Sequence, residues 1–280
     1  MSRSQLAPGV EVVAVPGRGL AVRTAEGEFL AVRTGDADQT ALLSRLSGTA
    51  AGEPHGELDR VVRAFEDAGY LADGTRRPRW PADRRAVLLL GDRVLTEPLA
   101  ALLRALGAEP RTAAHDGGSP SPDDLSAGDP AAVVWCLDGP VPEGLWDAAD
   151  RLPERGIGWL RCHREGWQAY VDPLAAAPGD VTSAHVRARR LAATPAHREL
   201  AAYWSGPRTS GAPVHLTAPA AGLLAALLAD DLSRWISGTT DTDGLPARRR
   251  LRRVDLRTLT VTEHPVLPVP DVAPTPKQAG

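Results

Sequence analysis

The segment from residue 86 to residue 107, AVLLLGDRVLTEPLAALLRALG, constrains the fold more than any other part of the chain. It begins with a run of apolar residues, passes through Gly91, and continues with apolar residues at helical spacing. A buried strand that turns at a glycine into an amphipathic helix is the first half of a βαβ unit, as in nucleotide-binding folds. We therefore expect a parallel or mixed sheet that is covered by helices.

The glycines that bind phosphate in such folds are almost absent. A G-x-G-x-x-G segment lets the backbone approach a pyrophosphate at the start of a helix. The equivalent residues here run from Gly91 to Thr96, and only the first is glycine. Val94 and Leu95 carry side chains where the backbone needs to approach, and Asp92 repels phosphate. No G-x-x-x-x-G-K-[ST] segment occurs either, so we expect no nucleotide cofactor.

Strands and helices alternate through the rest of this α/β part, which we assign to residues 86–280. Strands are predicted at 87–90, 131–138, 157–163 and 167–174, and a hairpin-like pair at 249–267. Helices are predicted at 96–107, 143–156, 185–204 and 218–238.

Residues 1–75 predict a separate module, joined to the α/β part by a polar linker at 76–85. Short β-rich runs at 10–15, 20–23 and 29–32 are separated by PGRG and AEG, which favour turns. Asp36 or Asp38 can cap a helix that carries Leu42, Leu43 and Leu46 inward, and 57–68 is a second amphipathic helix. Three strands and two helices in so short a segment are typical of a small winged-helix module.

Charge and hydropathy exclude several classes of partner. The formal net charge is −3, which gives no indication of nucleic acid or an anionic membrane as a partner. The longest apolar run, GLLAALLA, is far too short to cross a bilayer, and the first residues lack the apolar segment of a signal peptide. We therefore expect a cytoplasmic protein.

Candidate catalytic and metal-binding residues are sparse. The histidines are scattered without an HExxH motif, and no G-x-S-x-G segment is present. Cys136 and Cys162 form no CxxC pair. Cys162 precedes His163, but neighbours on a strand point to opposite faces, so these two cannot act together there. We predict two buried structural cysteines, no catalytic residue and no bound metal.

Several segments, taken together, resemble the ThiF-like partner proteins of azoline-forming peptide biosynthesis, also called cyclodehydratase-associated or TOMM leader-peptide-binding proteins. The segments are WLR-H-EG at 159–166, PG at 178–179, YW at 203–204, a helix-ending glycine at 238, VDL at 254–256 and H-x-VLP-x-P at 264–270. The resemblance covers essentially the whole chain. It implies a PqqD-like winged-helix element in front of a degenerate ThiF-like Rossmann domain.

Members of this family commonly hold a structural zinc with two CxxC pairs. By position, the first pair falls at Ser183 and Val186 and the second at Asp271 and Pro274. None of the four is cysteine, so we expect the zinc site to be lost. We expect the apolar residues at 266–269 to hold the C-terminal segment instead.

The resemblance implies a non-catalytic scaffold in bacteriocin-like or thiopeptide-like natural-product biosynthesis. In the family, a separate YcaO-type protein activates the peptide amide with ATP. The leader of the precursor peptide adds as a strand to the third strand of the winged-helix element, beside its last helix. We expect arginines there to meet acidic leader side chains. The candidate peptide-binding residues are Glu28, Phe29, Leu30, Ala31, Val32, Arg33, Arg60 and Arg63.

Two other functions stay open on the sequence alone. A nucleotide-dependent adenylating enzyme fits the architecture but lacks the glycines and the lysine. A DNA-binding winged-helix regulator fits the first module, but the helix at 57–68 holds four acidic residues against two arginines. We also expect self-association as a homodimer, because the helix at 220–235 is apolar enough to serve as core or interface.

Overall fold

The computed structural model describes residues 4–49, 55–73, 80–113, 120–209, 211–238 and 244–270. The chain divides into two compact units, Met1–Arg77 and Pro78–Gly280. Among the described residues, no helix combines the length and the apolar character that crossing a membrane requires.

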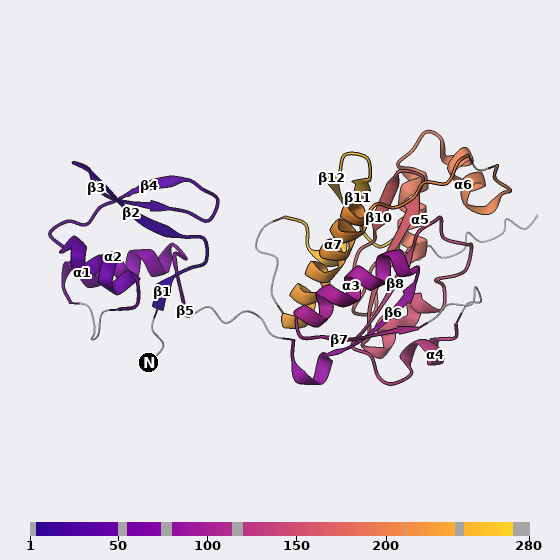
Figure 1. Cartoon of the computed structure of the whole chain (residues 1–280), viewed down its shortest axis with the longest axis horizontal. Helices are drawn as coiled ribbons and strands as arrows, with labels where there is room; N and C mark the ends of the chain where they lie inside the picture. Colours follow the sequence, from indigo (N-terminus) through magenta and orange to yellow (C-terminus); the bar gives the residue numbers. More distant parts are fainter. Residues whose placement is uncertain are drawn as a thin grey trace, which may run out of the picture. The chain divides into compact units, whose positions relative to one another are not determined.

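The first unit is built on a three-stranded antiparallel sheet in the order β2-β3-β4 (Figure 1). The strands are β2 (Glu11–Val15), β3 (Gly19–Arg23) and β4 (Phe29–Val32). They lie where the β-rich runs predict them. Turns at the two glycine-containing segments reverse the chain between them, because glycine accepts the positive φ angles that these turns need.

Two helices pack on this sheet. Helix α1 (Gln39–Leu46) begins after Asp38, whose carboxylate accepts a hydrogen bond from the backbone N–H of Thr40 at 2.9 Å. Helix α2 (Glu57–Asp67) follows. The buried side chains that join both helices to β3 are Leu20, Val22, Leu42, Leu46, Val61, Val62 and Phe65. The predicted cap and the predicted inward positions Leu42 and Leu46 are confirmed.

A second sheet of the first unit is not predicted by the sequence pattern. Strand β1 (Ser4–Leu6) pairs antiparallel with β5 (Leu71–Asp73). Strands of three residues carry too little alternation for periodicity to detect. The pairing brings the two ends of this unit together.

The second unit contains a seven-stranded mixed sheet in the order β12-β11-β10-β9-β8-β6-β7. Neighbours from β7 to β9 pair in parallel, whereas β10, β11 and β12 pair antiparallel. The strands are β6 (Ala86–Gly91), β7 (Glu109–Ala113), β8 (Ala132–Leu137), β9 (Gly158–Glu165), β10 (Gln168–Val171), β11 (Arg250–Asp255) and β12 (Thr260–Pro265). This mixed α/β architecture agrees with the predicted Rossmann-like fold.

Helices cover both faces of the seven-stranded sheet. Helices α3 (Arg93–Ala105) and α7 (Ala218–Ser237) pack against each other on one face, where they form the largest core cluster with the strands (Figure 1). Leu224 and Leu228 of α7 are fully buried in that core. The other face carries a cluster rich in tryptophan, packed beneath the short helix α4 (Pro122–Ser126).

The second unit differs from the sequence predictions in several places, including helix α4, which forms in a segment without a predicted helix. Residues 143–156 form turns and a 3₁₀ helix over Ala149–Arg155 rather than an α-helix, and Pro153 lies inside that segment. The helix predicted at 185–204 is divided into α5 (Ser183–Ala192) and α6 (His197–Ser205), with Pro195 between them. Strand β7 was not predicted. It contains Pro110 and lies at the edge of the sheet, where proline is tolerated.

Part of the predicted linker packs on the second unit. Trp80 is only 4% exposed and belongs to the large core cluster. The guanidinium carbon of Arg84 lies 4.3 Å from the ring centroid of Trp235 on α7. The predicted linker residues 76–79 lie outside the described residues.

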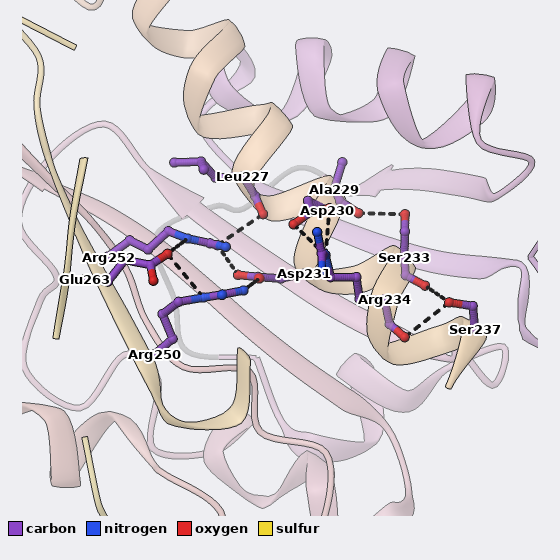
Figure 2. A network of polar contacts seen from close by, with 10 residues as sticks. All are labelled: Leu227, Ala229, Asp230, Asp231, Ser233, Arg234, Ser237, Arg250, Arg252 and Glu263. Carbon is purple, nitrogen blue, oxygen red and sulfur yellow. Dashed lines mark hydrogen bonds and ion pairs between the residues drawn. The ribbon is translucent and has the colours of Figure 1, made fainter. Parts of the chain in front are cut away.

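A buried ion network fastens α7 to the antiparallel end of the sheet (Figure 2). Asp231 of α7, 1% exposed, accepts a hydrogen bond from Arg250 Nη2 at 2.6 Å and another from Arg252. Both arginines lie on β11, and Arg252 Nε also donates to Glu263 of β12 at 3.0 Å. Burial raises the pKa of Asp231, and the two arginines act in the opposite direction.

Candidate functional site

Strand β4 has one free edge. Within the described residues it pairs with β3 alone. The backbone N–H of Thr24 donates to the carbonyl of Glu28 at 2.8 Å. Because hydrogen-bonded and non-hydrogen-bonded pairs alternate along an antiparallel ladder, the N–H of Leu30 points toward β3 and that of Ala31 points toward the free edge. The free edge therefore presents main-chain groups that can pair with another strand.

A groove of about 390 Å³ runs between β4 and α2. Its floor is apolar and includes the buried side chains of Val22, Val61 and Phe65. Leu30 forms part of one wall and is 44% exposed. An apolar groove beside an unpaired strand edge supplies what strand addition needs, namely main-chain partners and places for alternate side chains.

Five of the eight predicted peptide-binding residues line this groove, and three do not. The lining residues are Leu30, Ala31, Val32, Arg33 and Arg60. Glu28 lies in the turn before β4, Phe29 is 64% exposed outside the groove, and Arg63 lies elsewhere on α2. Leu30 and Val32 share one face of β4, and Phe29 and Ala31 share the other, so the strand pleat accounts for the position of Phe29 but not for that of Ala31.

The arginines of α2 already have acidic partners. Arg60 pairs with Glu57 and Arg63 with Asp59, each at 2.8 Å and each within the helix. A helix with neutralised arginines is a poor phosphate-binding surface, which weakens the DNA-binding alternative. Arg33, by contrast, lines the groove without an ion pair to any carboxylate among the described residues. Arg33 is therefore the best placed cation for an acidic ligand.

The carboxyl ends of β6 and β8 form the topological switch point, where open α/β sheets commonly bind ligands. Gly91 has a φ of +101°, and a Cβ there would lie 1.8 Å from the carbonyl oxygen of Cys136. The close approach of two strands therefore requires this glycine. The carboxylate of Asp92 accepts a hydrogen bond from the backbone N–H of Asp138 at 2.6 Å. Two acidic residues at this edge oppose phosphate binding.

The two cysteines lie directly opposite each other in the register of β8 and β9. Both are fully buried and form no disulfide. Burial raises the pKa of the Cys136 thiol to about 12 and that of Cys162 well above its ordinary value. Cys162 packs in the core under α3 and α7, whereas its neighbour His163 lines a cavity on the other face. The predictions of structural cysteines and of opposite faces for Cys162 and His163 are confirmed.

That cavity, also about 390 Å³ in volume, lies beside the carboxyl end of β9 and is not predicted by our sequence analysis. Its walls come from β9, from α5 and from residues 141–147. One face of β9 carries Trp159, Arg161, His163 and Glu165, which alternate with residues facing the other side. A row of ionisable side chains on an interior strand is the signal that could have located this cavity from the sequence.

Glu165 is the centre of the polar contacts around the cavity. Its carboxylate accepts hydrogen bonds from Trp204 Nε1 of α6 at 2.7 Å and from Arg190 of α5 at 2.6 and 3.0 Å. His163 Nε2 lies 3.5 Å from the same carboxylate. Burial alone raises the pKa of Glu165, but the hydrogen bonds from His163 and Arg190 outweigh it and hold the pKa well below the ordinary 4.5.

A second polar group lies deeper on the same face of β9. Arg161 has no exposed side-chain surface and lies 3.1 Å from Asp172 and 3.4 Å from Asp150. Asp150 also accepts hydrogen bonds from the backbone N–H of Ser183 at 2.9 Å and from its hydroxyl at 2.6 Å. The carboxylate thereby supplies an acceptor for a backbone N–H at the N-terminus of α5 that has no partner within the helix.

An apolar cluster occupies the region where the family resemblance places the zinc. Val186 packs with Val181, Leu251 and Val266. Val266 therefore helps to hold the C-terminal segment, as predicted, but Leu267 is 60% exposed and does not. Arg189 of α5 instead donates hydrogen bonds to the carbonyls of residues 267 and 268.

Metal ligands are not gathered anywhere in the part of the chain that the structure describes. No group of three or more His, Cys, Asp or Glu side chains there is placed to hold a metal ion. Asp271 and Pro274, the second pair of positions that the resemblance assigns to zinc, lie outside the described residues.

No protein-family model matches the chain, and no curated protein matches it. Solved structures match its fold. A heterocyclase in complex with substrate and cofactor aligns over 96% of this chain with a TM-score of 0.64 and 16% identity. The heterocyclase TruD aligns over 96% with a TM-score of 0.64 and 15% identity. E. coli MccB aligns over 96% of this chain and 95% of its own, with a TM-score of 0.58 and 11% identity.

These similarities establish a shared fold. The chain spans 39% and 42% of the lengths of the two heterocyclase chains, so most of each heterocyclase has no counterpart here.

Proposed function

We propose that this chain binds the leader of a ribosomal precursor peptide and presents the peptide to a separate YcaO-type cyclodehydratase, without catalysing a reaction itself. The observation that carries the proposal is the apolar groove beside the free edge of β4. The shared fold with the heterocyclases supports it, since one of them is described in complex with its substrate.

In this proposal the first unit is a PqqD-like winged-helix recognition element. The leader pairs with the outward-facing main-chain groups of β4, such as the N–H of Ala31. Alternate apolar side chains of the leader enter the groove over Val61 and Phe65. An acidic leader residue meets Arg33, which has no acidic partner among the described residues.

The first requirement of this function concerns the gene neighbourhood. A short reading frame for a precursor peptide and a gene for a YcaO-type enzyme are expected beside the gene for this chain. The peptide encoded there, labelled with a fluorophore, is then the probe for binding to the full chain by fluorescence anisotropy. If no such peptide is encoded nearby, or if it does not bind, the scaffold function is wrong.

Two variants and two matched controls test the binding surface. Ala31→Pro removes the outward-facing donor and should weaken binding at least tenfold, whereas Ala31→Val keeps the N–H and should bind like the parent. Arg33→Glu should cost about 1–3 kcal/mol of binding energy if its contact is charge-assisted. Arg18→Glu makes the same charge change in the exposed turn before β3 and is the matched control.

Circular dichroism spectra must show that all four variants are folded. If folded Ala31→Pro and folded Arg33→Glu both bind the peptide like the parent, the leader does not lie on β4.

A further inference from the structure

The cavity beside β9 has an acidic mouth. Glu143 and Asp147 line it and are exposed, and neither forms an ion pair with any described residue. Acidic side chains at a surface are commonly just solvated, so they do not define a site by themselves. Because they lie at a cavity of about 390 Å³, the groups inside that cavity decide whether it can bind a ligand.

The interior holds buried polar atoms without hydrogen-bond partners. Asp172, with a 2% exposed side chain, uses one carboxylate oxygen for Arg161 and has no partner for Oδ1. His163, with a 5% exposed side chain, has no partner for Nδ1. Buried polar atoms without partners are rare in folded proteins, and the carboxylate oxygen Asp172 Oδ1 can only accept a hydrogen bond from a donor.

Most of the cations around the cavity have acidic partners. Arg190 is held by Glu165 through two hydrogen bonds, and Arg161 is shared by two carboxylates. Arg187 lacks a carboxylate partner among the described residues, and its guanidinium carbon lies 5.0 Å from the ring centroid of Trp204. The cavity as a whole therefore offers more negative charge and more acceptors than its own donors satisfy.

We infer that this cavity binds a basic side chain, a guanidinium or an ammonium group, presented on a peptide. The cation supplies a donor to Asp172 and balances the carboxylates at the mouth. The peptide form is favoured over a free amine by Trp146, which lines the cavity and whose buried Nε1–H has no acceptor. An amide carbonyl beside the basic side chain supplies that acceptor. This inference stands independently of leader binding at β4.

The first test compares three probes by isothermal titration calorimetry on the full chain. N-acetyl-arginine-N-methylamide should bind with a Kd on the order of 1 mM or below, as expected for a fragment of this size. The neutral citrulline analogue has nearly the same shape and should bind at least tenfold more weakly. N-propylguanidine carries the guanidinium as its only charge, without the peptide groups, and should also bind more weakly. Equal binding of the arginine and citrulline probes would overturn the inference, and tighter binding of N-propylguanidine would show that the cavity does not recognise a peptide.

Variants then test where the arginine probe binds and whether the cavity prefers a cationic ligand. The double variant Glu143→Gln, Asp147→Asn should weaken binding of the arginine probe about fivefold, because each exposed carboxylate contributes modestly. Glu154→Gln lies on the exposed surface outside the cavity and should leave binding unchanged. Arg187→Gln removes a cation from the cavity wall and should tighten binding of the cationic probe.

The Arg187→Gln result separates a cationic from an anionic ligand. If this variant binds the arginine probe more weakly, or if the double variant at the mouth binds it as tightly as the parent does, the cavity does not recognise a basic side chain. The cavity variants change groups at the mouth or wall rather than the Glu165 network, and the circular dichroism spectra of all variants should match that of the parent.

Discussion

Gly91 ends β6 with a left-handed backbone conformation, where an added Cβ would lie 1.8 Å from the carbonyl oxygen of Cys136. Gly91→Ala should therefore destabilise the protein by about 3 kcal/mol or more, because the methyl group forces two parallel strands apart. Urea denaturation, followed by tryptophan fluorescence, measures this loss.

Gly139→Ala is the matched control for this substitution. No heavy atom lies within 4 Å of the Cβ it would add, and its φ is not in the left-handed region. It should change the free energy of unfolding by about 1 kcal/mol or less. Equal midpoints for the two variants would show that close strand approach is not what requires Gly91.

Asp231 forms buried ion pairs, whereas its neighbour Asp230 forms an exposed one (Figure 2). Asp231→Asn removes the buried charge that Arg250 and Arg252 share, and should cost about 3 kcal/mol or more. Asp230→Asn breaks an exposed pair with Arg234 on the helix surface and should cost about 0.5 kcal/mol or less. Thermal unfolding of both variants gives the comparison, and similar losses would mean that α7 does not depend on the buried network.

At the scale of elements, Glu165 connects β9, α5 and α6 through one carboxylate. Its pKa is depressed in the folded state, so the stability it contributes is present above the unfolded value near 4.5 and is lost as the pH falls below it. Glu165→Gln should be clearly less stable than the parent at pH 7, and the difference should shrink on acidification. Melting temperatures between about pH 3 and pH 7 test this. A difference that stays constant would contradict the depressed pKa.

Elements with strong local signals could be predicted from the sequence. The turn at PGRG and the carboxylate of Asp38 fix the bounds of their neighbouring elements, because both act within a few residues. The helix expected at 143–156 does not form, although its apolar spacing is helical, because residues in that segment pack on the tryptophan cluster in turns and a 3₁₀ helix. Strands of three residues, such as β1, carry no pattern to detect.

The candidate site could be predicted in position but not in detail. The family resemblance indicated the strand at 29–32 and the helix at 57–68, and the groove lies between them. The sequence could not reveal that Arg60 and Arg63 are paired within their own helix, since that depends on side-chain geometry. The cavity beside β9 is assembled from segments far apart in the chain, so local patterns alone could not define its walls.

At the scale of the whole molecule, the adenylating alternative predicts that ATP with Mg²⁺ raises the melting temperature. We expect no such rise, because Asp92 and Asp138 occupy the edge where phosphates would bind. Differential scanning fluorimetry at several ATP concentrations measures this. A rise in melting temperature that grows with ATP concentration would support the nucleotide-dependent adenylating alternative.

The chain contains two cysteines, and both lie in the interior of the second unit, opposite each other on β8 and β9. An alkylating reagent can reach them only when that unit opens. The rate of thiol modification under native conditions therefore measures how often the second unit opens, and the measurement needs no engineered residue. Because the first unit contains no cysteine, its own opening does not change the rate of thiol modification.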